Sequence, residues 1–524
     1  MRNAWLLLLT ACGVQSGGAA DTTGGNNVSF GGAQDLGQFR DILDTGGIPG
    51  PDTLDANGFF NEHYNAPPPA DCGQTLCITP GLAVGHDWLT GAHQATVQLS
   101  ITTPVDPSTY HRMPMNLVLV IDRSGSMSSD GRLDKVKSGI ATLIDNLQDG
   151  DSLAIVDFDD RVTVDAPLTA ELDRTNLKAI VAQLYPRGGT DINAGVQAGF
   201  RLLGDAPASD HQNRVILLSD GNATSGITDT ATILANADTS IDRGIGLTTI
   251  GVGHDFDVKL MRGLAEHGAG NFYFLEDGSA ADEVFSQELD YFLTPLALDV
   301  TVTATQGAGF TFGDIVGSHL WEGSSMRLPA VFLASRTSQT GEPGRRGGGS
   351  MIFIHATPTG HDGGKVGSFT LTYHLPGSTE LLTQSASLDY TPDGTDDLYL
   401  SAPEMAERYA MYNMYLGFRF ATQQGATSCA AAGLTATRAS AIAWNAEKSD
   451  PDIAADLVLL DKYLANLGPA ADTGATPDTC TTSDPYQGGD GAYTPTPLAC
   501  STGAATGSLP IGLALLALRR RRRR

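Results

Sequence analysis

Five polar side chains in the central part of the sequence have the types that bind a hard divalent cation. Asp122, Ser124 and Ser126 lie close together in the chain, and Thr190 and Asp220 follow at later positions. Hydroxyl and carboxylate oxygens, without His or Cys, are the donors that Mg²⁺, Mn²⁺ or Ca²⁺ prefer. The pattern therefore predicts a site for one divalent cation, with Mg²⁺ as the favoured ion and Mn²⁺ or Ca²⁺ as alternatives.

Each of these residues follows an apolar segment or lies in a glycine-rich loop before a helix. Apolar segments typical of buried strands lie at 117–121, 152–158, 215–219, 247–252 and 271–274. Helical periodicity lies between them at 133–147, 176–184, 192–203, 229–241 and 257–267. Fully apolar strands that alternate with helices predict a doubly wound α/β domain with a mostly parallel sheet. Since ligands collect outside the carboxyl ends of such strands, the five side chains are expected to meet there.

The alternation and the run Asp-Arg-Ser-Gly-Ser at 122–126 resemble the von Willebrand factor A (VWA) domain, which has a Rossmann-like fold. The resemblance implies that the five side chains form a metal-ion-dependent adhesion site. Ser124, Ser126 and Thr190 would bind the ion directly, and the two Asp residues would act mostly through water. One coordination position would stay open, and a protein partner would fill it with an acidic residue.

The five-residue pattern departs from the family at one neighbouring position, and its residues could also have a purely structural role. Ser219 stands where the family has Thr before the last Asp. Ser124 and Ser126 could also serve only as caps of the following helix, while the Asp residues stabilise turns. Five matching positions in the right order are far more specific than one D-x-S-x-S match, so the cation site is the preferred interpretation.

The segments on either side of residues 114–298 read as further structural units. Residues 28–113 contain one amphipathic helix and alternating strands, and together with the α/β part they resemble the bacterial YfbK-like group of VWA proteins. Short alternating strands predict a β-sandwich-like domain at 299–400. A helical segment follows at 401–468, with helical periodicity at 403–424 and 453–467. Residues 469–499 are rich in Pro, Thr and Gly and are expected to form a surface spacer.

The N-terminus has the features of an export signal. A basic start is followed by an apolar core, so residues 1–12 are expected to be a signal peptide. The run Leu-Thr-Ala-Cys that ends at Cys12 resembles a bacterial lipobox, which would make Cys12 the acylated mature N-terminus. The alternative is an ordinary signal peptide with an incidental cysteine. Residues 13–27 would form a flexible tether.

The C-terminus has the features of a sorting or membrane segment. In residues 500–524, Cys500 precedes an apolar stretch and six arginines. This arrangement resembles the MYXO-CTERM sorting signal of myxobacteria and their relatives, which implies cleavage near Cys500 and transfer to the cell surface. The alternative is a tail anchor, because the uncharged stretch could span a bilayer of about 30 Å. Both interpretations predict an exported protein that is attached to the envelope or outer surface of a Gram-negative cell.

Four further cysteines are expected to form disulfides in such an oxidising compartment. They are Cys72, Cys77, Cys429 and Cys480, and three pairings are open to them. The local pair Cys72–Cys77 together with Cys429–Cys480 is the simplest pairing. A zinc site suits this spacing poorly because no His lies near the C-x₄-C run.

Charge and motifs limit the classes of function. The formal net charge of −27 argues against a nucleic acid as partner. The sequence has no G-x-S-x-G or H-E-x-x-H motif, so we expect no enzyme. The leading hypothesis is a surface-anchored binding module that acts through its cation in adhesion or envelope assembly. Two alternatives are a structural envelope protein with a vestigial site and a component of an enzyme or protease complex that acts through residues 300–468.

Overall fold

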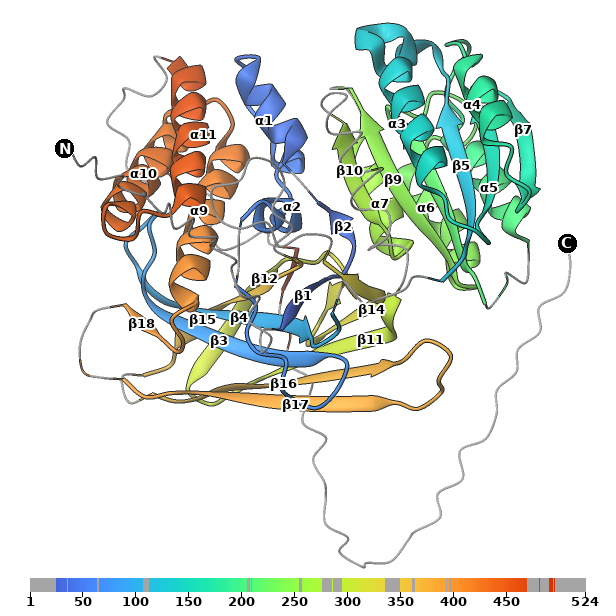
Figure 1. The fold of residues 1–524 in the computed structure, drawn as a ribbon. Coiled ribbons are helices and arrows are strands. Elements are labelled where there is room, and N and C mark those ends of the chain that lie inside the picture. The colour runs from blue at the N-terminus through green and yellow to red at the C-terminus, as the bar shows by residue number, and fades with distance from the viewer. Residues whose placement is uncertain are drawn as a thin grey trace, which may run out of the picture.

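Two β-sheets and a group of helices organise the protein, and Figure 1 shows their arrangement in the computed structural model. The structure describes residues 25–34, 36–63, 66–106, 113–204, 208, 210–253, 257–275, 285, 295–334, 349–360, 363–392, 394, 398–468, 480, 490–492 and 494. Cys12 and Cys500, with the predicted terminal signals, lie outside the described residues. Within these ranges, no helix combines the length and the apolarity that crossing a membrane requires.

The α/β domain is built on a seven-stranded sheet with the order β2-β10-β9-β8-β5-β6-β7. Every neighbouring pair is parallel except β6 and β7. The predicted doubly wound, mostly parallel sheet is therefore confirmed. Its strands are β2 (Gly32–Ala33), β5 (Met115–Asp122), β6 (Ser152–Phe158), β7 (Val162–Thr169), β8 (Gln212–Ser219), β9 (Ile245–Val252) and β10 (Asn271–Leu275).

Helices cover both faces of this sheet because its central strands are apolar on both sides. Leu119 and Ile121 of β5 pack on one face with Ile140, whereas Val118 and Val120 pack on the other face with Val196. This alternation follows from the period of two residues along a strand. The first face is covered by α3 (Arg132–Asn146) and α4 (Arg174–Ala182), and the second by α5 (Ile192–Leu203), α6 (Thr230–Ile241) and α7 (Val258–His267).

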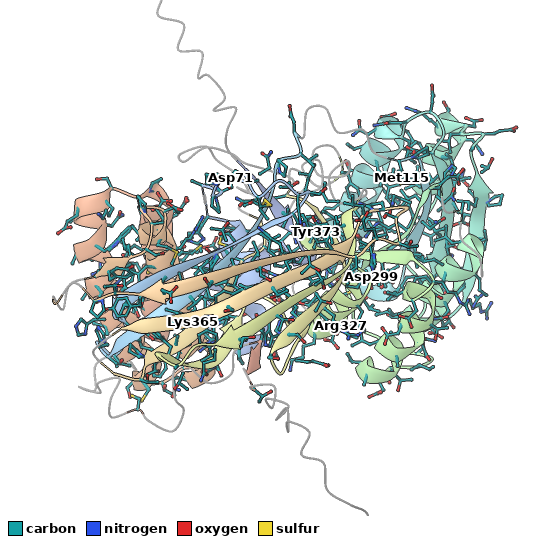
Figure 2. All side chains as sticks on the ribbon, turned by 90° about the horizontal axis from the view of Figure 1, so that it is seen from below. Asp71, Met115, Asp299, Arg327, Lys365 and Tyr373 are labelled. Carbon is teal, nitrogen blue, oxygen red and sulfur yellow. A yellow bond between two sulfur atoms is a disulfide. The ribbon has the colours of Figure 1, made fainter. Side chains whose placement is uncertain are left out.

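The second sheet has twelve strands, and its two halves face each other across one apolar core. The short strand β1 joins the halves, because it pairs with β14 on one side and with β4 on the other. Lys365 and Tyr373 lie toward opposite ends of β16 in Figure 2, where the long strands cross the molecule beside the α/β domain. The strands are β1 (Asn26–Ser29), β3 (Cys77–His86), β4 (His93–Thr103), β11 (Pro295–Gln306), β12 (Phe310–Val316), β13 (Trp321–Glu322), β14 (Ser325–Leu333), β15 (Ile352–Pro358), β16 (Gly364–His374), β17 (Leu382–Tyr390), β18 (Tyr399–Leu400) and β19 (Gly491–Ala492).

The helical layer combines the two ends of the described chain. Phe39 of α1 packs edge-on against Phe418 of α9 and Tyr463 of α11, so segments about 400 residues apart share one core. The helices are α1 (Gly37–Asp44), α2 (Ala56–Asn61), α9 (Met405–Gln424), α10 (Ser428–Lys448) and α11 (Pro451–Leu467), with a 3₁₀ turn at Pro51–Thr53. The sequence pattern does not predict α10, because its buried side chains are mostly small and leave no strong apolar stripe.

The division of the chain into units differs from the one expected from the sequence. Strands β3 and β4 of residues 28–113 pair into the same sheet as the strands of residues 299–400, so the two segments form one β-sandwich. Asn26 and Asn27, expected in the tether at 13–27, are paired in β1. Pairing between segments far apart in sequence produces this sandwich, and local patterns do not record such pairing.

Two disulfides, Cys72–Cys77 and Cys429–Cys480, are present with the pairing that is simplest by spacing. The second disulfide connects α10 to Cys480, in the segment 469–499 that was expected to be a surface spacer. Strand β19 of the same segment pairs with β12. The described part of this segment is therefore attached to the folded protein rather than extended away from it.

Candidate metal site

Three loops meet at the carboxyl edge of the α/β sheet. Asp122 ends β5, Ser219 ends the neighbouring strand β8, and the loop before α5 contributes Thr190. The loops are bonded directly to one another: the backbone N–H of Gly125 donates to the Gly188 carbonyl at 3.1 Å. The five residues predicted from the sequence therefore lie on three connected loops at one edge of the sheet.

Asp122 is fully buried and both of its carboxylate oxygens are occupied by donors. Oδ1 accepts the backbone N–H of Ser124 at 2.7 Å, and Oδ2 accepts the hydroxyl of Ser219 at 2.5 Å. Burial, together with the nearby Asp220 carboxylate, raises the pKa of Asp122 to about 7, although these two hydrogen bonds lower it. Ser219, which replaces the usual Thr, therefore orients this carboxylate. A bound cation would favour its charged form.

Ser124 and Ser126 place their hydroxyls together, with the two Oγ atoms 3.0 Å apart. Ser124 is buried, whereas Ser126 is exposed at the surface. Ser124 precedes the 3₁₀ segment Gly125–Gly131, yet its side chain makes no capping hydrogen bond. The capping alternative for Ser124 is therefore not what the structure shows, and the hydroxyls of Ser124 and Ser126 hydrogen-bond to each other instead.

Asp220 has one oxygen that lacks a hydrogen-bond donor among the described residues. Its Oδ2 accepts from Arg132 Nη1 at 3.1 Å, whereas Oδ1 is buried and unpartnered. A buried carboxylate oxygen without a partner is costly unless a donor or a cation is bound there. Arg132 was not singled out from the sequence, because nothing in a helix-opening Arg indicates that it reaches a loop 88 residues away.

Thr190 is held in place by backbone contacts with the loop after β8. Its N–H donates to the Thr224 hydroxyl at 3.0 Å, and its carbonyl accepts the N–H of Thr224 at 3.0 Å and of Ser225 at 3.1 Å. The next residue, Asp191, caps α5 by accepting the N–H of Ala194 at 2.9 Å. The Thr190 hydroxyl takes no part in these contacts and stays free for a ligand.

Buried ion pairs beside the site support these loops, and the sequence pattern did not reveal them. Arg123 Nη1 lies 3.2 Å from Asp157 Oδ2, and Asp159 Oδ2 accepts from Arg187 Nε at 2.5 Å. Asp157 and Asp159 are buried, so they do not form a solvated strand end. The ring of Tyr185 covers Arg123 at 5.1 Å and is itself 58% exposed.

The donor set fits one hard divalent cation. Ser124, Ser126 and Thr190 offer neutral hydroxyls, and Asp122 and Asp220 offer carboxylates, without any nitrogen or sulfur ligand. Neutral hydroxyls leave a bound ion electron-poor, so a further carboxylate from outside would bind it strongly. The unpartnered Oδ1 of Asp220 is the observation in this structure that calls for such an ion.

The doubly wound sheet, with an oxygen-rich site at its carboxyl edge, has the arrangement expected of a VWA domain. The family model for the von Willebrand factor type A domain matches residues 116–287, and the chain therefore contains a VWA domain. VWA domains commonly bind a divalent cation at this motif and use it in protein–protein interaction.

Similar proteins come from bacteria and animals. The chain is 30% identical to YfbK of Escherichia coli over 35% of this chain and 32% of that protein. It is 26% identical to human inter-alpha-trypsin inhibitor heavy chain H1 over 42% of this chain and 25% of that protein. The match thus spans a third or less of these relatives. A solved VWA protein of Catenulispora acidiphila is 17% identical with a TM-score of 0.49, covering 74% of this chain and 89% of that one.

Proposed function

We propose that this protein is a non-enzymatic binding module that is exported and anchored at the cell surface. Its VWA domain would hold one divalent cation, Mg²⁺ by preference, through Asp122, Ser124, Ser126, Thr190 and Asp220. A partner protein would complete the coordination with a Glu or Asp side chain, in adhesion or envelope assembly. The observation that carries the proposal is the buried, unpartnered Oδ1 of Asp220 beside two converging serine hydroxyls.

A calorimetric titration with Mg²⁺, Mn²⁺ and Ca²⁺ tests the cation part of this proposal. The full chain, produced in an oxidising compartment, is compared with Asp122→Ala and with the control Asp134→Ala, whose side chain is 85% exposed on α3. We expect one saturable site in the wild type and the control, and none in Asp122→Ala. Equal binding in all three chains would contradict it.

Retention of envelope proteins on the immobilised chain tests the partner part. We expect a protein that is retained with Mg²⁺, released by EDTA and not retained by Asp122→Ala. Retention that ignores both EDTA and the substitution would instead support a structural envelope protein with a vestigial site. Surface anchoring is tested separately, by protease accessibility on intact cells with and without residues 500–524.

A further inference from the structure

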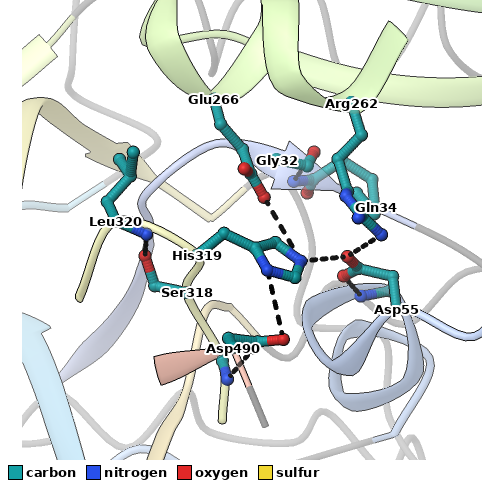
Figure 3. Close-up of polar contacts among 12 residues, drawn as sticks. Gly32, Gln34, Asp55, Arg262, Glu266, Ser318, His319, Leu320 and Asp490 are labelled. Carbon is teal, nitrogen blue, oxygen red and sulfur yellow. Dashed lines mark hydrogen bonds and ion pairs between the residues drawn. The ribbon is translucent and has the colours of Figure 1, made fainter. Parts of the chain in front are cut away.

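A second group of charged side chains joins four segments that are far apart in the sequence. It consists of Asp55, Arg262, Glu266, His319 and Asp490, which we call the junction cluster (Figure 3). Asp55 caps α2, Arg262 and Glu266 lie on α7, His319 lies between β12 and β13, and Asp490 precedes β19. The cluster therefore connects the VWA domain to the β-sandwich and to the C-terminal segment.

The imidazole of His319 faces carboxylates on both of its ring nitrogens, as Figure 3 shows. Nε2 lies 3.5 Å from Asp55 Oδ2 and 4.0 Å from Glu266 Oε1, and Nδ1 lies 3.4 Å from Asp490 Oδ1. These separations exceed the roughly 2.7–3.2 Å of an N–H···O hydrogen bond. Ligand atoms at about 2.0–2.1 Å from one tetrahedral zinc ion lie about 3.3–3.5 Å apart. The 3.5 Å between His319 Nε2 and Asp55 Oδ2 matches this spacing, whereas the 4.0 Å to Glu266 Oε1 is longer.

We propose that the junction cluster binds a divalent transition-metal ion of the zinc class. The ligands are His319 Nε2, Asp55 Oδ2 and Glu266 Oε1, which all lie within 4.8 Å of one another. A water molecule would take the fourth position. Binding needs only a small inward movement of the Glu266 carboxylate, whose oxygen is the more distant of the two from Nε2.

Asp490 faces the second ring nitrogen of His319 at 3.4 Å, and on closing to hydrogen-bond distance it would supply the outer support that metal-bound histidines usually have. A carboxylate on the second ring nitrogen fixes the tautomer and raises the basicity of the ligating nitrogen. Asp490 Oδ1 faces His319 Nδ1, and its Oδ2 is held by the backbone N–H of Gly317 at 2.5 Å. This leaves the lone pair of Nε2 directed toward the space between Asp55 and Glu266.

The charge of the cluster also calls for a cation. Three carboxylates lie together, with side chains 10%, 11% and 9% exposed for Asp55, Glu266 and Asp490. Glu266 accepts no hydrogen bond from the described residues, although it is nearly buried. Arg262, whose Nη1 lies 3.1 Å from Asp55 Oδ2, is a permanent cation of the cluster. Burial lowers the pKa of His319, but Asp490 and Asp55 outweigh it and raise that pKa to about 9, so a divalent ion would have to displace the imidazole proton. A divalent ion together with this guanidinium would balance the three carboxylates.

The ion would have a position distinct from the first site. Among the five residues of the junction cluster, Glu266 alone lines the cavity of about 500 Å³ between α7 and β14. Helix α7 runs back from the carboxyl end of β9 to the start of β10, so Glu266 in its last turn lies at the amino edge of the sheet. Asp122 lies at the opposite, carboxyl edge. The second ion would thus fix the VWA domain against the β-sandwich.

Calorimetric titration of the full-length Asp122→Ala chain with Zn²⁺ and Mn²⁺ tests this inference without interference from the first site. We expect one Zn²⁺ per chain. Adding Glu266→Gln or His319→Gln should weaken zinc binding at least tenfold, and Asp490→Asn about 10- to 100-fold. Arg262→Gln should tighten it, because it removes a repelling charge. His267→Gln, on the same helix but paired with Asp238, is the control that should change nothing.

Far-UV circular dichroism in EDTA shows whether each variant stays folded. The inference is overturned if Asp122→Ala binds no Zn²⁺, or if Glu266→Gln and Arg262→Gln change zinc affinity in the same direction. If the wild-type chain binds Zn²⁺ but no Mg²⁺, the zinc inference stands and the proposed function fails.

Discussion

Arg132 Nη1 donates to Asp220 Oδ2 across 3.1 Å, and both side chains are almost fully buried. This ion pair joins the first helix of the VWA domain to the third loop of the metal site. It fixes the Asp220 carboxylate so that Oδ1 stays unpartnered. It also places a permanent positive charge beside the position that we assign to a cation.

Replacing Arg132 with Gln is expected to raise the affinity for Mg²⁺ at least tenfold. Gln keeps a hydrogen-bond donor for Asp220 but removes the charge that repels the ion, and one unit charge near a divalent ion is worth several kcal/mol at an effective dielectric of about 20. Calorimetry at two salt concentrations measures the change. A lower affinity would mean that orientation of Asp220 matters more than charge.

Thr190→Val should reduce Mg²⁺ affinity at least tenfold, whereas Thr190→Ser should retain it within about threefold. Val removes only the hydroxyl, because the backbone N–H and carbonyl of residue 190 make the contacts with Thr224 and Ser225. The melting temperature in EDTA is the control for folding. Equal Mg²⁺ affinity in both variants would exclude Thr190 as a ligand.

Tyr185→Ala should weaken binding of a partner protein while leaving Mg²⁺ affinity unchanged. Its ring is 58% exposed and covers Arg123, which follows Asp122 in the chain. Tyr and Arg side chains are frequent contributors to the binding energy of protein interfaces. The comparison requires the partner from the retention experiment and calorimetry with Mg²⁺ alone. A loss of cation affinity would place Tyr185 in the metal site instead.

The buried pair His63–Asp456 should make stability depend on pH above neutrality. Nε2 of His63 lies 2.9 Å from Asp456 Oδ2, with Asp452 nearby on the same helix. Burial favours neutral His63, but the Asp456 carboxylate outweighs it and raises the pKa of His63 to about 9. Because this exceeds the unfolded value of about 6.5, the stabilisation is complete below pH 6.5 and is lost as pH rises to 9.

Urea unfolding at pH 6, 7.5 and 9 measures this effect. The loss in unfolding free energy between pH 6 and pH 9 is expected to be at most about 3 kcal/mol. His63→Gln should be less stable than the wild type at pH 6 and should lose the pH dependence. If His63→Gln shows the same dependence of unfolding free energy on pH as the wild type, other groups cause that dependence.

Gly31→Ala should destabilise the junction between the two sheets by about 2 kcal/mol or more. Gly31 has φ +85°, and an added Cβ would overlap the Gly270 carbonyl oxygen. The residue lies between β1 of the β-sandwich and β2 of the VWA domain. Gly50→Ala, where a Cβ would meet nothing within 4 Å, is the control. If Gly31→Ala and Gly50→Ala unfold at similar urea concentrations, the backbone strain expected for a side chain at position 31 is contradicted.

Strands and helices with strong periodicity were predictable, and those with weak patterns were not. The predicted strand 152–158 coincides with β6 (Ser152–Phe158), and the helix 192–203 coincides with α5 (Ile192–Leu203). Strand β7 was missed because it is an exposed edge strand that contains Asp165 and Pro167. Strand β2 was missed because two residues carry no period; it exists only through pairing with β10.

The sequence alone predicted the α/β domain and the loops that carry the five candidate residues of the first site, because each residue lies beside a strand or helix whose local pattern fixes its place. Only the tertiary structure decided the roles of Arg132 and of the junction cluster. Asp55 and Asp490 lie 435 positions apart, and their approach depends on β1, β12 and β19 pairing across the whole chain. Local periodicity carries no record of such long-range pairing, so these groups become visible only when the packed sheets bring them together.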